Sequence, residues 1–513
     1  MYDCTLRCLR RLVLSGALCA TAAPAFAQHA PVGTNLVRVD DWTTAFAFLD
    51  VFKTSRAWVS LQRAGTPDPR PLDLDARGWV RSLQPGQFAT TFLFWDLSRA
   101  PGQYPAGRYV VTYEGEGTLA YSGSAVRVDA TPGREVIDVD PNRGGGIRID
   151  ITATNPANYL RNISVRLSTS STTDVFDPTF VERVAPYRVL RFKDWQATDG
   201  DWTVNGPSQQ RRWSDRPVVD DARWSGTHGV PLEIMAALAN RTGADAWFSM
   251  PHQADDDYVR QFAQLALQLL SPTIKVYVEY SNEVWNGNYA QARYAQTQGL
   301  ALGLSQNATE AGIRFHSRRS REIFGIWEGV FPRERLVRVL GSFHLNAAVT
   351  QTALAYGDTA AHTDAVAVAP YFGFRDAASA RGLSLDAIMQ RLDTTLLAEA
   401  QTATLAQVNV LRNYRLPLIA YEGGQALTAP GDATLTDLFL QANRDPRMGN
   451  VYTRFLQDWN SATAGGLLVH FTDCWSAFGS LEYISQPRSQ APKYDALMRW
   501  IEQDPNPGVP PGR

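Results

Sequence analysis

The chain has 513 residues, 44% of them hydrophobic and 19% charged, so a large packed core is expected and disorder is not the default. The formal net charge of −2 argues against a nucleic-acid-binding protein, which would normally carry a basic excess on one face. The aromatic share of 11% suits sugar binding, because flat rings stack on sugar rings, although most of the 14 Trp residues are expected to be structural.

The amino-terminal segment is typical of an export signal. An arginine-rich start precedes the short apolar run Leu12–Ala23, and Ala27 closes a small-x-small pattern. The sequence therefore predicts cleavage after Ala27 and a secreted or periplasmic protein without a membrane anchor. Of the 4 cysteines only Cys474 lies beyond this segment, so we expect no internal disulfide and no metal site built on several cysteines.

A first apolar run, Gly33–Trp42, predicts a strand, and the region that follows it has a different character. Short β-type runs separated by Gly, Pro, Asn and Asp predict a small antiparallel β-sandwich. The runs are Tyr104–Tyr113, Thr118–Tyr121, Ala125–Val128, Glu135–Val139, Gly146–Thr152 and Ile163–Leu167. The predicted boundaries are 28–66 for a first barrel strand and helix, 67–170 for an inserted sandwich, and 171–513 for the remainder of the barrel.

From about Tyr187 onward, short apolar runs alternate with amphipathic helices, which is typical of parallel strands joined by crossover helices. The runs are Val189–Trp195, Asp245–His252, Ile274–Trp285, Val337–Asn346, Asp364–Phe372, Pro417–Gln425 and Leu467–Trp475. The clearest helical stretches are Leu232–Thr242, Asp256–Leu270, Thr309–Gly325 and Leu385–Tyr414. With Gly33–Trp42 as an eighth strand, the fold class is α/β, a (β/α)₈ TIM barrel with an inserted antiparallel β-sandwich.

Two of these predicted strands end in a carboxylate. The run Val276–Asn286 delivers Asn282 and Glu283, and the run Leu418–Gly424 delivers Glu422 followed by glycines. Barrel active sites form at the carboxyl ends of the strands, so both side chains should meet in one cleft. Glycoside hydrolysis requires such a pair, one group to protonate the leaving oxygen and another to attack the anomeric carbon or to activate water.

This pattern resembles clan A of the glycoside hydrolases, the retaining barrel enzymes typified by family 5 cellulases and mannanases. The resemblance implies Glu283 as general acid/base, Glu422 as nucleophile, and Asn282 as a partner of the 2-hydroxyl of the sugar in the −1 subsite. Other positions that match the clan pattern are Arg191, bracing the nucleophile, His252, lining the −1 subsite, Tyr371, bonded to the nucleophile, and Trp475, stacked beneath the sugar. Trp285, with Trp195, Trp202 and Trp224, lies at or after strand ends and is expected to build outer subsites.

The substrate that follows is a β-linked polysaccharide or oligosaccharide of the β-glucan, cellulose or hemicellulose type. Glu279 competes with Glu283 but should lie deeper in the barrel, where it would pair with an Arg or Lys. Two rival functions remain: a glycan-binding barrel without turnover, and glycan binding by the sandwich alone. No serine-esterase elbow, zinc motif or phosphate-binding loop is found, so no metal or cofactor is expected.

Overall fold

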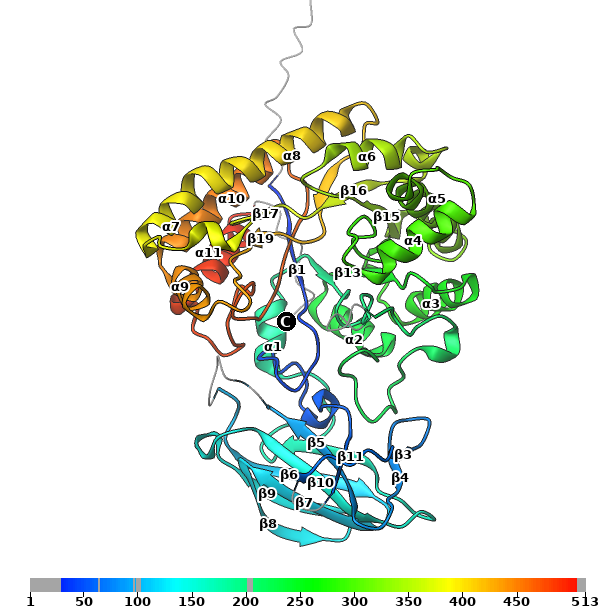
Figure 1. Cartoon of the computed structure of the whole chain (residues 1–513), viewed down its shortest axis with the longest axis vertical. Helices are drawn as coiled ribbons and strands as arrows, with labels where there is room; N and C mark the ends of the chain where they lie inside the picture. Colours follow the sequence, from blue (N-terminus) through cyan, green and yellow to red (C-terminus); the bar gives the residue numbers. More distant parts are fainter. Residues whose placement is uncertain (1–28, 63–64, 96, 98–102, 201–205, 505–513) are drawn as a thin grey trace, which may run out of the picture.

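The computed structural model describes residues 29–62, 65–95, 97, 103–200 and 206–504. The predicted export signal, residues 1–27, and Trp202 lie outside the described residues, so secretion stays a prediction. Figure 1 shows two lobes, a helix-rich one above and an all-β one below, joined by the segment that follows the first strand. Within the described residues, no helix has the length and apolarity needed to cross a membrane.

The upper lobe is a closed barrel of eight parallel strands, which confirms the predicted fold class. Each strand lies at or within one residue of one of the eight predicted apolar runs, because a barrel strand is covered on both faces and therefore carries almost continuous apolar residues. β1 closes the barrel by pairing with β12 on one side and β20 on the other. In order around the barrel the strands are β1 (Val32–Asn35), β12 (Val189–Arg191), β13 (Asp245–Met250), β14 (Val276–Tyr280), β15 (Leu336–Gly341), β16 (Ala365–Val368), β18 (Leu418–Ala420) and β20 (Leu468–His470).

Helices surround this barrel, and several begin where the sequence supplies a capping residue (Figure 1). The side chain of Asp255, just before α3, accepts a hydrogen bond from the backbone N–H of Tyr258. The helices are α1 (Pro178–Val184), α2 (Leu232–Thr242), α3 (Asp256–Leu269), α4 (Ala290–Ala301), α5 (Ala308–Glu328), α6 (Ala347–Leu354), α7 (Leu385–Arg391), α8 (Leu397–Arg412), α9 (Ala433–Arg444), α10 (Arg447–Thr463) and α11 (Pro492–Glu502).

The lower lobe holds two four-stranded antiparallel sheets, with strand orders β2-β5-β10-β7 and β11-β6-β9-β8. Their inward side chains form a hydrophobic core distinct from that between the barrel and its helices. The strands are β2 (Val59–Gln62), β5 (Gln87–Leu93), β6 (Gly107–Glu114), β7 (Gly117–Gly123), β8 (Ala125–Thr131), β9 (Arg134–Val139), β10 (Ile147–Thr154) and β11 (Arg161–Leu167), with a small hairpin of β3 (Asp73–Leu74) and β4 (Val80–Ser82).

The structure corrects the expected boundary between barrel and sandwich. β2 pairs with β5, so the sandwich begins at Val59 and not at residue 67. The described residues between β1 and β2 contain no α-helix; a single 3-10 helix, Val51–Thr54, is capped by Asp50. The first α-helix of the barrel, α1, follows the sandwich instead.

The chain passes between the lobes twice, and the two crossings lie side by side. The backbone N–H of Leu49 donates to the carbonyl of Val175, and that of Asp177 donates to the carbonyl of Ala47, each at 2.9 Å. Insertion of the sandwich therefore leaves the two ends of the interrupted barrel segment adjacent.

Candidate active site

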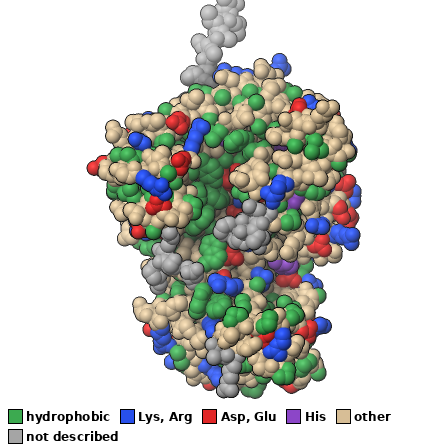
Figure 2. Space-filling model, viewed as in Figure 1, with side chains coloured by type: hydrophobic (Ala, Val, Ile, Leu, Met, Phe, Trp, Pro, Cys, Tyr) green, Lys and Arg blue, Asp and Glu red, His purple; other side chains and the backbone are tan. Residues whose placement is uncertain are grey.

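A cleft of about 450 Å³ lies at the carboxyl ends of the barrel strands and contains both carboxylates singled out in the sequence, Glu283 and Glu422. This volume is within the range of small-molecule sites. In the view of Figure 2, hydrophobic side chains gather in a hollow of the barrel lobe. The residues that line the cleft are Val37, Arg38, Trp42, Lys193, Asp194, Ala197, Asp199, Gly200, Asn282, Glu283, Tyr289, Tyr371, Glu422, Ala426, Phe471, Trp475 and Phe478.

Glu422, just after β18, accepts hydrogen bonds on both carboxylate oxygens. Arg191 Nη1 donates to Oε1 at 2.9 Å, and the Tyr371 hydroxyl donates to Oε2 at 2.9 Å. Lys193 Nζ lies 3.5 Å from Oε1. Two residues after Glu422 the backbone requires glycine, because Gly424 has φ +125° and a Cβ there would lie 2.8 Å from the Tyr452 hydroxyl. Arg191 and Tyr371 therefore lie where the resemblance placed them.

Arg191 ties this carboxylate to the interior of the barrel. Its guanidinium is fully buried, and Nη2 donates to Glu279 Oε2 at 2.8 Å and to Asn282 Oδ1 at 3.1 Å. Glu279 is 1% exposed and also accepts from Trp247 Nε1 at 3.0 Å. Glu279 is therefore the structural partner of an arginine, as predicted, and of the two glutamates Glu283 is the one that lines the cleft.

Glu283 is in different surroundings. Burial, then the negative charge of Glu422, raises its pKa from 4.5 to about 7. Its Oε2 accepts from Asn286 Nδ2 at 2.8 Å, and its Oε1 accepts from the Tyr421 hydroxyl at 3.1 Å. Near neutral pH this group can hold a proton while its neighbour is paired with cations.

The backbone between β14 and this glutamate is strained. Ser281 has φ +57° and Glu283 has φ +44°, both in the left-handed region that residues other than glycine rarely adopt. Two such residues around Asn282 turn the chain sharply at the end of the strand. Strain of this kind is found at functional sites, where the surrounding structure imposes it.

Asn282 lies beside Glu283, but both ends of its amide are already engaged. Its Oδ1 accepts from Arg191, and its Nδ2 donates to Asp199 Oδ1 and Oδ2, each at 3.1 Å. Gln291 Nε2 donates to the same Asp199 at 2.7 Å, and Lys193 Nζ donates to it at 3.2 Å. Asn282 is 2% exposed, whereas the Asp199 side chain is 13% exposed.

Trp475 and His252, two of the remaining predicted residues, have contrasting positions. Trp475 lines the cleft beside Phe478, with ring centroids 5.2 Å apart. His252 is not among the lining residues: it follows the end of β13, and its ring packs against Tyr294 of α4 at 5.3 Å. Neither ring nitrogen has a partner among the described residues, and burial lowers the pKa of His252 to about 4, so the expected role at the −1 subsite is corrected.

Trp285 is also absent from the cleft wall. Its ring packs against Tyr421 and His316, with centroids 6.1 and 6.0 Å away, and against the cluster that contains Trp247 and Val339 of the barrel strands. The expectation of an outer sugar subsite at Trp285 is therefore corrected, because the turn after β14 directs this ring onto the side chains inside the barrel.

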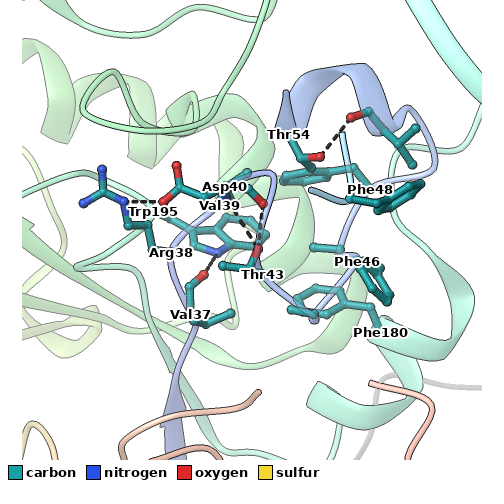
Figure 3. Close-up of a pocket in the computed structure, with 14 residues that line it drawn as sticks. Val37, Arg38, Val39, Asp40, Thr43, Phe46, Phe48, Thr54, Phe180 and Trp195 are labelled. Carbon is teal, nitrogen blue, oxygen red and sulfur yellow. Dashed lines mark hydrogen bonds and ion pairs between the residues drawn. The ribbon is translucent and has the colours of Figure 1, made fainter. Parts of the chain in front are cut away.

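Trp195 and Trp224, expected in outer subsites, are buried where barrel and sandwich meet. Figure 3 shows Trp195 beneath the loop after β1, where its Nε1 donates to the carbonyl of Val37 at 3.0 Å beside a cavity of about 20 Å³. Trp224 packs on Phe48 at 5.1 Å. The aromatic residues that do line the cleft, besides Tyr371 and Trp475, are Trp42, Tyr289, Phe471 and Phe478.

Sequence reasoning missed Lys193, Asp199 and Tyr421. Lys193 lies two residues after Arg191, the spacing that places side chains on one face of a strand, so strand alternation could have indicated it. Although burial lowers the pKa of its amine, Asp194, then Asp199 and Glu422, raise it well above the usual value. Nothing local indicated Asp199, which a long loop brings to the cleft.

Cys474, the one cysteine beyond the predicted export signal, is a free and buried thiol next to Trp475. Burial raises the pKa of this thiol well above its usual value, so it keeps its proton. No group of three or more His, Cys, Asp or Glu side chains suited to holding a metal ion occurs in the described part of the chain.

No family model and no curated protein matches the chain. Among solved structures it is similar to the GH51 arabinofuranosidase from Xanthomonas axonopodis pv. citri, at 13% identity over 66% of this chain and 69% of that chain, with a TM-score of 0.41. It is also similar to a fungal β-1,4-galactanase (12% identity, 62% and 91% of the two chains, TM-score 0.35). A third is an endo-β-1,4-mannanase from Cellulomonas fimi (10% identity, 53% and 58%, TM-score 0.33). These likenesses concern the fold, and the chemistry of the site follows from its own geometry.

Proposed function

We propose that this protein is a retaining glycoside hydrolase that cleaves β-linked glycans, with Glu283 as general acid/base and Glu422 as nucleophile. The observation that carries the proposal is the unequal environment of two carboxyl groups in one cleft. Glu283 has a pKa raised to about 7, whereas Glu422 accepts from Arg191 and Tyr371. Double displacement requires one carboxyl group that can give a proton and a second that can attack the anomeric carbon.

The first step forms a glycosyl ester. Glu422 attacks the anomeric carbon through a carboxylate oxygen while the bond to the leaving oxygen breaks and Glu283 gives that oxygen its proton. As the negative charge of Glu422 is consumed, the pKa of Glu283 should fall, because that charge is one of the causes that raise it. In the second step the Glu283 carboxylate takes a proton from water, which attacks the same carbon and releases Glu422.

The cleft wall suits sugar rings. Tyr289, Phe471, Trp475 and Phe478 present aromatic surface, and a ring face packs on the C–H groups of a sugar while hydroxyl groups reach polar neighbours. This combination supports a β-glucan, cellulose or hemicellulose type of substrate as the proposed class.

The test is a glycan panel in which the anomeric configuration of the first product is followed by proton NMR. We expect the β-anomer first from a β-linked substrate, and loss of turnover in a Glu422→Gln variant that still folds. In Glu283→Ala, the rate of cleavage should fall far more for substrates with poor leaving groups than for activated aryl glycosides. Added azide should restore part of the rate and give a product of retained configuration. An α-anomer appearing first, or an active Glu422→Gln variant, would refute the proposal.

A further inference from the structure

We propose that Tyr421 is a positioning residue for the general acid/base: its hydroxyl holds the carboxyl group of Glu283 in one orientation and favours its carboxylate form. The inference rests on the proposed function and deepens it, because it adds a residue that acts on Glu283 without touching the sugar. The residue directly before the nucleophile Glu422 would then orient the nucleophile's partner.

The ring of Tyr421 is held from several sides. It is 1% exposed and lies in the buried cluster that contains Trp247 and Val339. Trp285 packs against it with ring centroids 6.1 Å apart, and the Arg191 guanidinium lies 4.9 Å from its centroid. Because these neighbours fix the ring, its hydroxyl is a fixed point beside the cleft.

This hydroxyl supplies one of two donors that hold the acid/base. It donates to Glu283 Oε1 at 3.1 Å, and Asn286 Nδ2 donates to Oε2 at 2.8 Å. With one donor on each oxygen, turning the plane of the carboxyl group would break both bonds. Tyr421 is not among the described residues that line the cleft, so its effect on the reaction passes through Glu283 and not through a sugar contact.

The Tyr421 hydroxyl keeps its proton through the reaction. Burial, then the charges of Glu283 and Glu422, raise the pKa of Tyr421 well above its usual value. A hydrogen bond to a carboxylate is stronger than one to a protonated carboxyl group, so this bond favours the ionised form of Glu283. That form takes a proton from water in the second step, and Tyr421 therefore supports the base role.

Other titratable groups face Glu283 and stay in place when the Tyr421 hydroxyl is removed. Beyond burial, Glu422 after β18 and Asp199 after β12 raise the pKa of Glu283, and Lys193 after β12 lowers it. A shift of the pH profile on loss of the hydroxyl therefore reports the hydroxyl. The neutral titratable groups within electrostatic reach of Glu283 are Tyr289, after β14, and Tyr371, after β16.

The experiment compares two variants that each lose one buried hydroxyl, Tyr421→Phe and Tyr280→Phe. Tyr280 is the matched control, because it is also 1% exposed and lies at the end of β14, but its hydroxyl donates to the His252 carbonyl at 3.0 Å. Both variants and the wild type are assayed across pH on a glycan with a poor leaving group and on an activated aryl glycoside.

In Tyr421→Phe the alkaline limb of kcat/KM for the glycan should move to higher pH, by up to about one unit, because a donor to the ionised form of Glu283 is lost. We expect kcat for the glycan to fall about 10-fold, as on removal of a hydrogen bond to a charged group, with KM within about two-fold of wild type.

The aryl glycoside separates the two steps. Its leaving group needs little protonation, so kcat/KM in Tyr421→Phe should change little, whereas kcat should fall because the glycosyl ester waits for the base. Tyr280→Phe should keep both limbs of the pH profile, with kcat within about two-fold of wild type on either substrate.

The outcomes separate this inference from the hydrolase proposal. An unmoved alkaline limb in Tyr421→Phe, or equal falls of kcat and kcat/KM on the aryl glycoside, would make Tyr421 a packing residue and overturn the inference, with the hydrolase proposal left standing. A wild type that cleaves neither aryl glycosides nor glycans ends both.

If Tyr421→Phe does not fold, site-specific replacement of Tyr421 by a fluorotyrosine decides, because the ring shape is nearly kept while the more acidic hydroxyl donates more strongly. This replacement should move the alkaline limb for the glycan to lower pH, the direction opposite to loss of the hydroxyl. A limb that stays in place or moves to higher pH overturns the inference.

Discussion

The proton on Glu283 is the property on which the proposed chemistry depends at the scale of single residues. Two groups act on it in opposite directions: the charge of Glu422 raises its pKa, and the hydrogen bond from Asn286 lowers it. Burial is the largest cause, so the turn that places this side chain inside the cleft also sets the pH range in which it can serve as an acid.

Asn286→Ala should move the alkaline limb of the kcat/KM profile to higher pH. The amide at 2.8 Å favours the ionised form of Glu283, so its loss should raise the pKa above about 7, by up to about one unit. The limb is measured with a glycan that has a poor leaving group. An aryl glycoside with a very good leaving group is the control and should show little change, and an unmoved limb on the glycan would contradict the role of Glu283.

Glu283→Gln should stabilise the protein at alkaline pH. The folded pKa of Glu283 is about 7 and the ordinary value is 4.5, so between these values the folded chain keeps a proton that the unfolded chain has lost. Wild-type stability from this group is therefore complete below 4.5 and is lost as pH rises to about 7, by about 1.4 kcal/mol per unit of pKa difference. Melting temperatures at pH 4 and pH 8 test this: the variant should melt at a higher temperature than the wild type only at pH 8.

At the scale of elements, the barrel strands could be predicted because each is buried on both faces and is therefore a continuous apolar run. β2 could not be predicted in this way, since only one of its four residues is buried and its sequence has no continuous apolar run. Glu283, Glu422 and Arg191 could be placed together because parallel strand ends meet at one mouth. His252 and Trp285 could not, because strand alternation ends with β13 and β14, and the loops beyond turn both rings out of the cleft.

The pair of helices α4 and α5 allows a matched test of packing. Gly299 of α4 lies against the backbone of Ala311 in α5, and a Cβ there would be closer to that carbonyl than real contacts allow. Gly299→Ala should therefore cost a few kcal/mol, because a backbone cannot give way as a side chain can. Gly325→Ala, in α5 with nothing within 4 Å, should gain about 0.5–1 kcal/mol from helix propensity alone. Urea unfolding of both variants measures the difference, and equal effects would refute the close approach of the helices.

At the scale of the whole molecule, the sandwich contacts the loop that forms one wall of the cleft. That loop follows β1 and carries Arg38 and Trp42, both of which line the cleft. Its Asp41 carbonyl accepts from the backbone N–H of Trp95, just after β5, at 2.8 Å. The inserted lobe therefore braces a substrate-facing loop, which gives it a physical connection to the site whether or not it binds glycan itself.

The ion pair between Arg56 and Asp41 can measure this bracing, because Arg56, in the segment that leads into β2, is fixed on β5 by a hydrogen bond from its backbone N–H to the Phe92 carbonyl at 3.0 Å. Arg56 Nη2 donates to Asp41 Oδ2 at 2.7 Å, and its Nε donates to both carboxylate oxygens at 3.1 and 3.2 Å. The Asp41 side chain is 4% exposed, so removing Arg56 weakens the pairing of a buried carboxylate and favours a movement of the loop that carries it. Because Trp42 is the next residue, such a movement should displace a cleft-lining ring while leaving Glu283 and Glu422 in place.

Arg56→Ala should therefore raise KM for a glycan about 3- to 10-fold, a loss of about 1 kcal/mol of binding, with kcat within about two-fold of wild type. A short aryl glycoside, which occupies less of the cleft, should be affected less. Arg81→Ala is the control, because Arg81 pairs with Asp73 in the β3–β4 hairpin, where both side chains are exposed, and such pairs contribute little. Equal KM values for the two variants, or a fall in kcat as large as the rise in KM, would show that the sandwich does not hold this wall of the cleft.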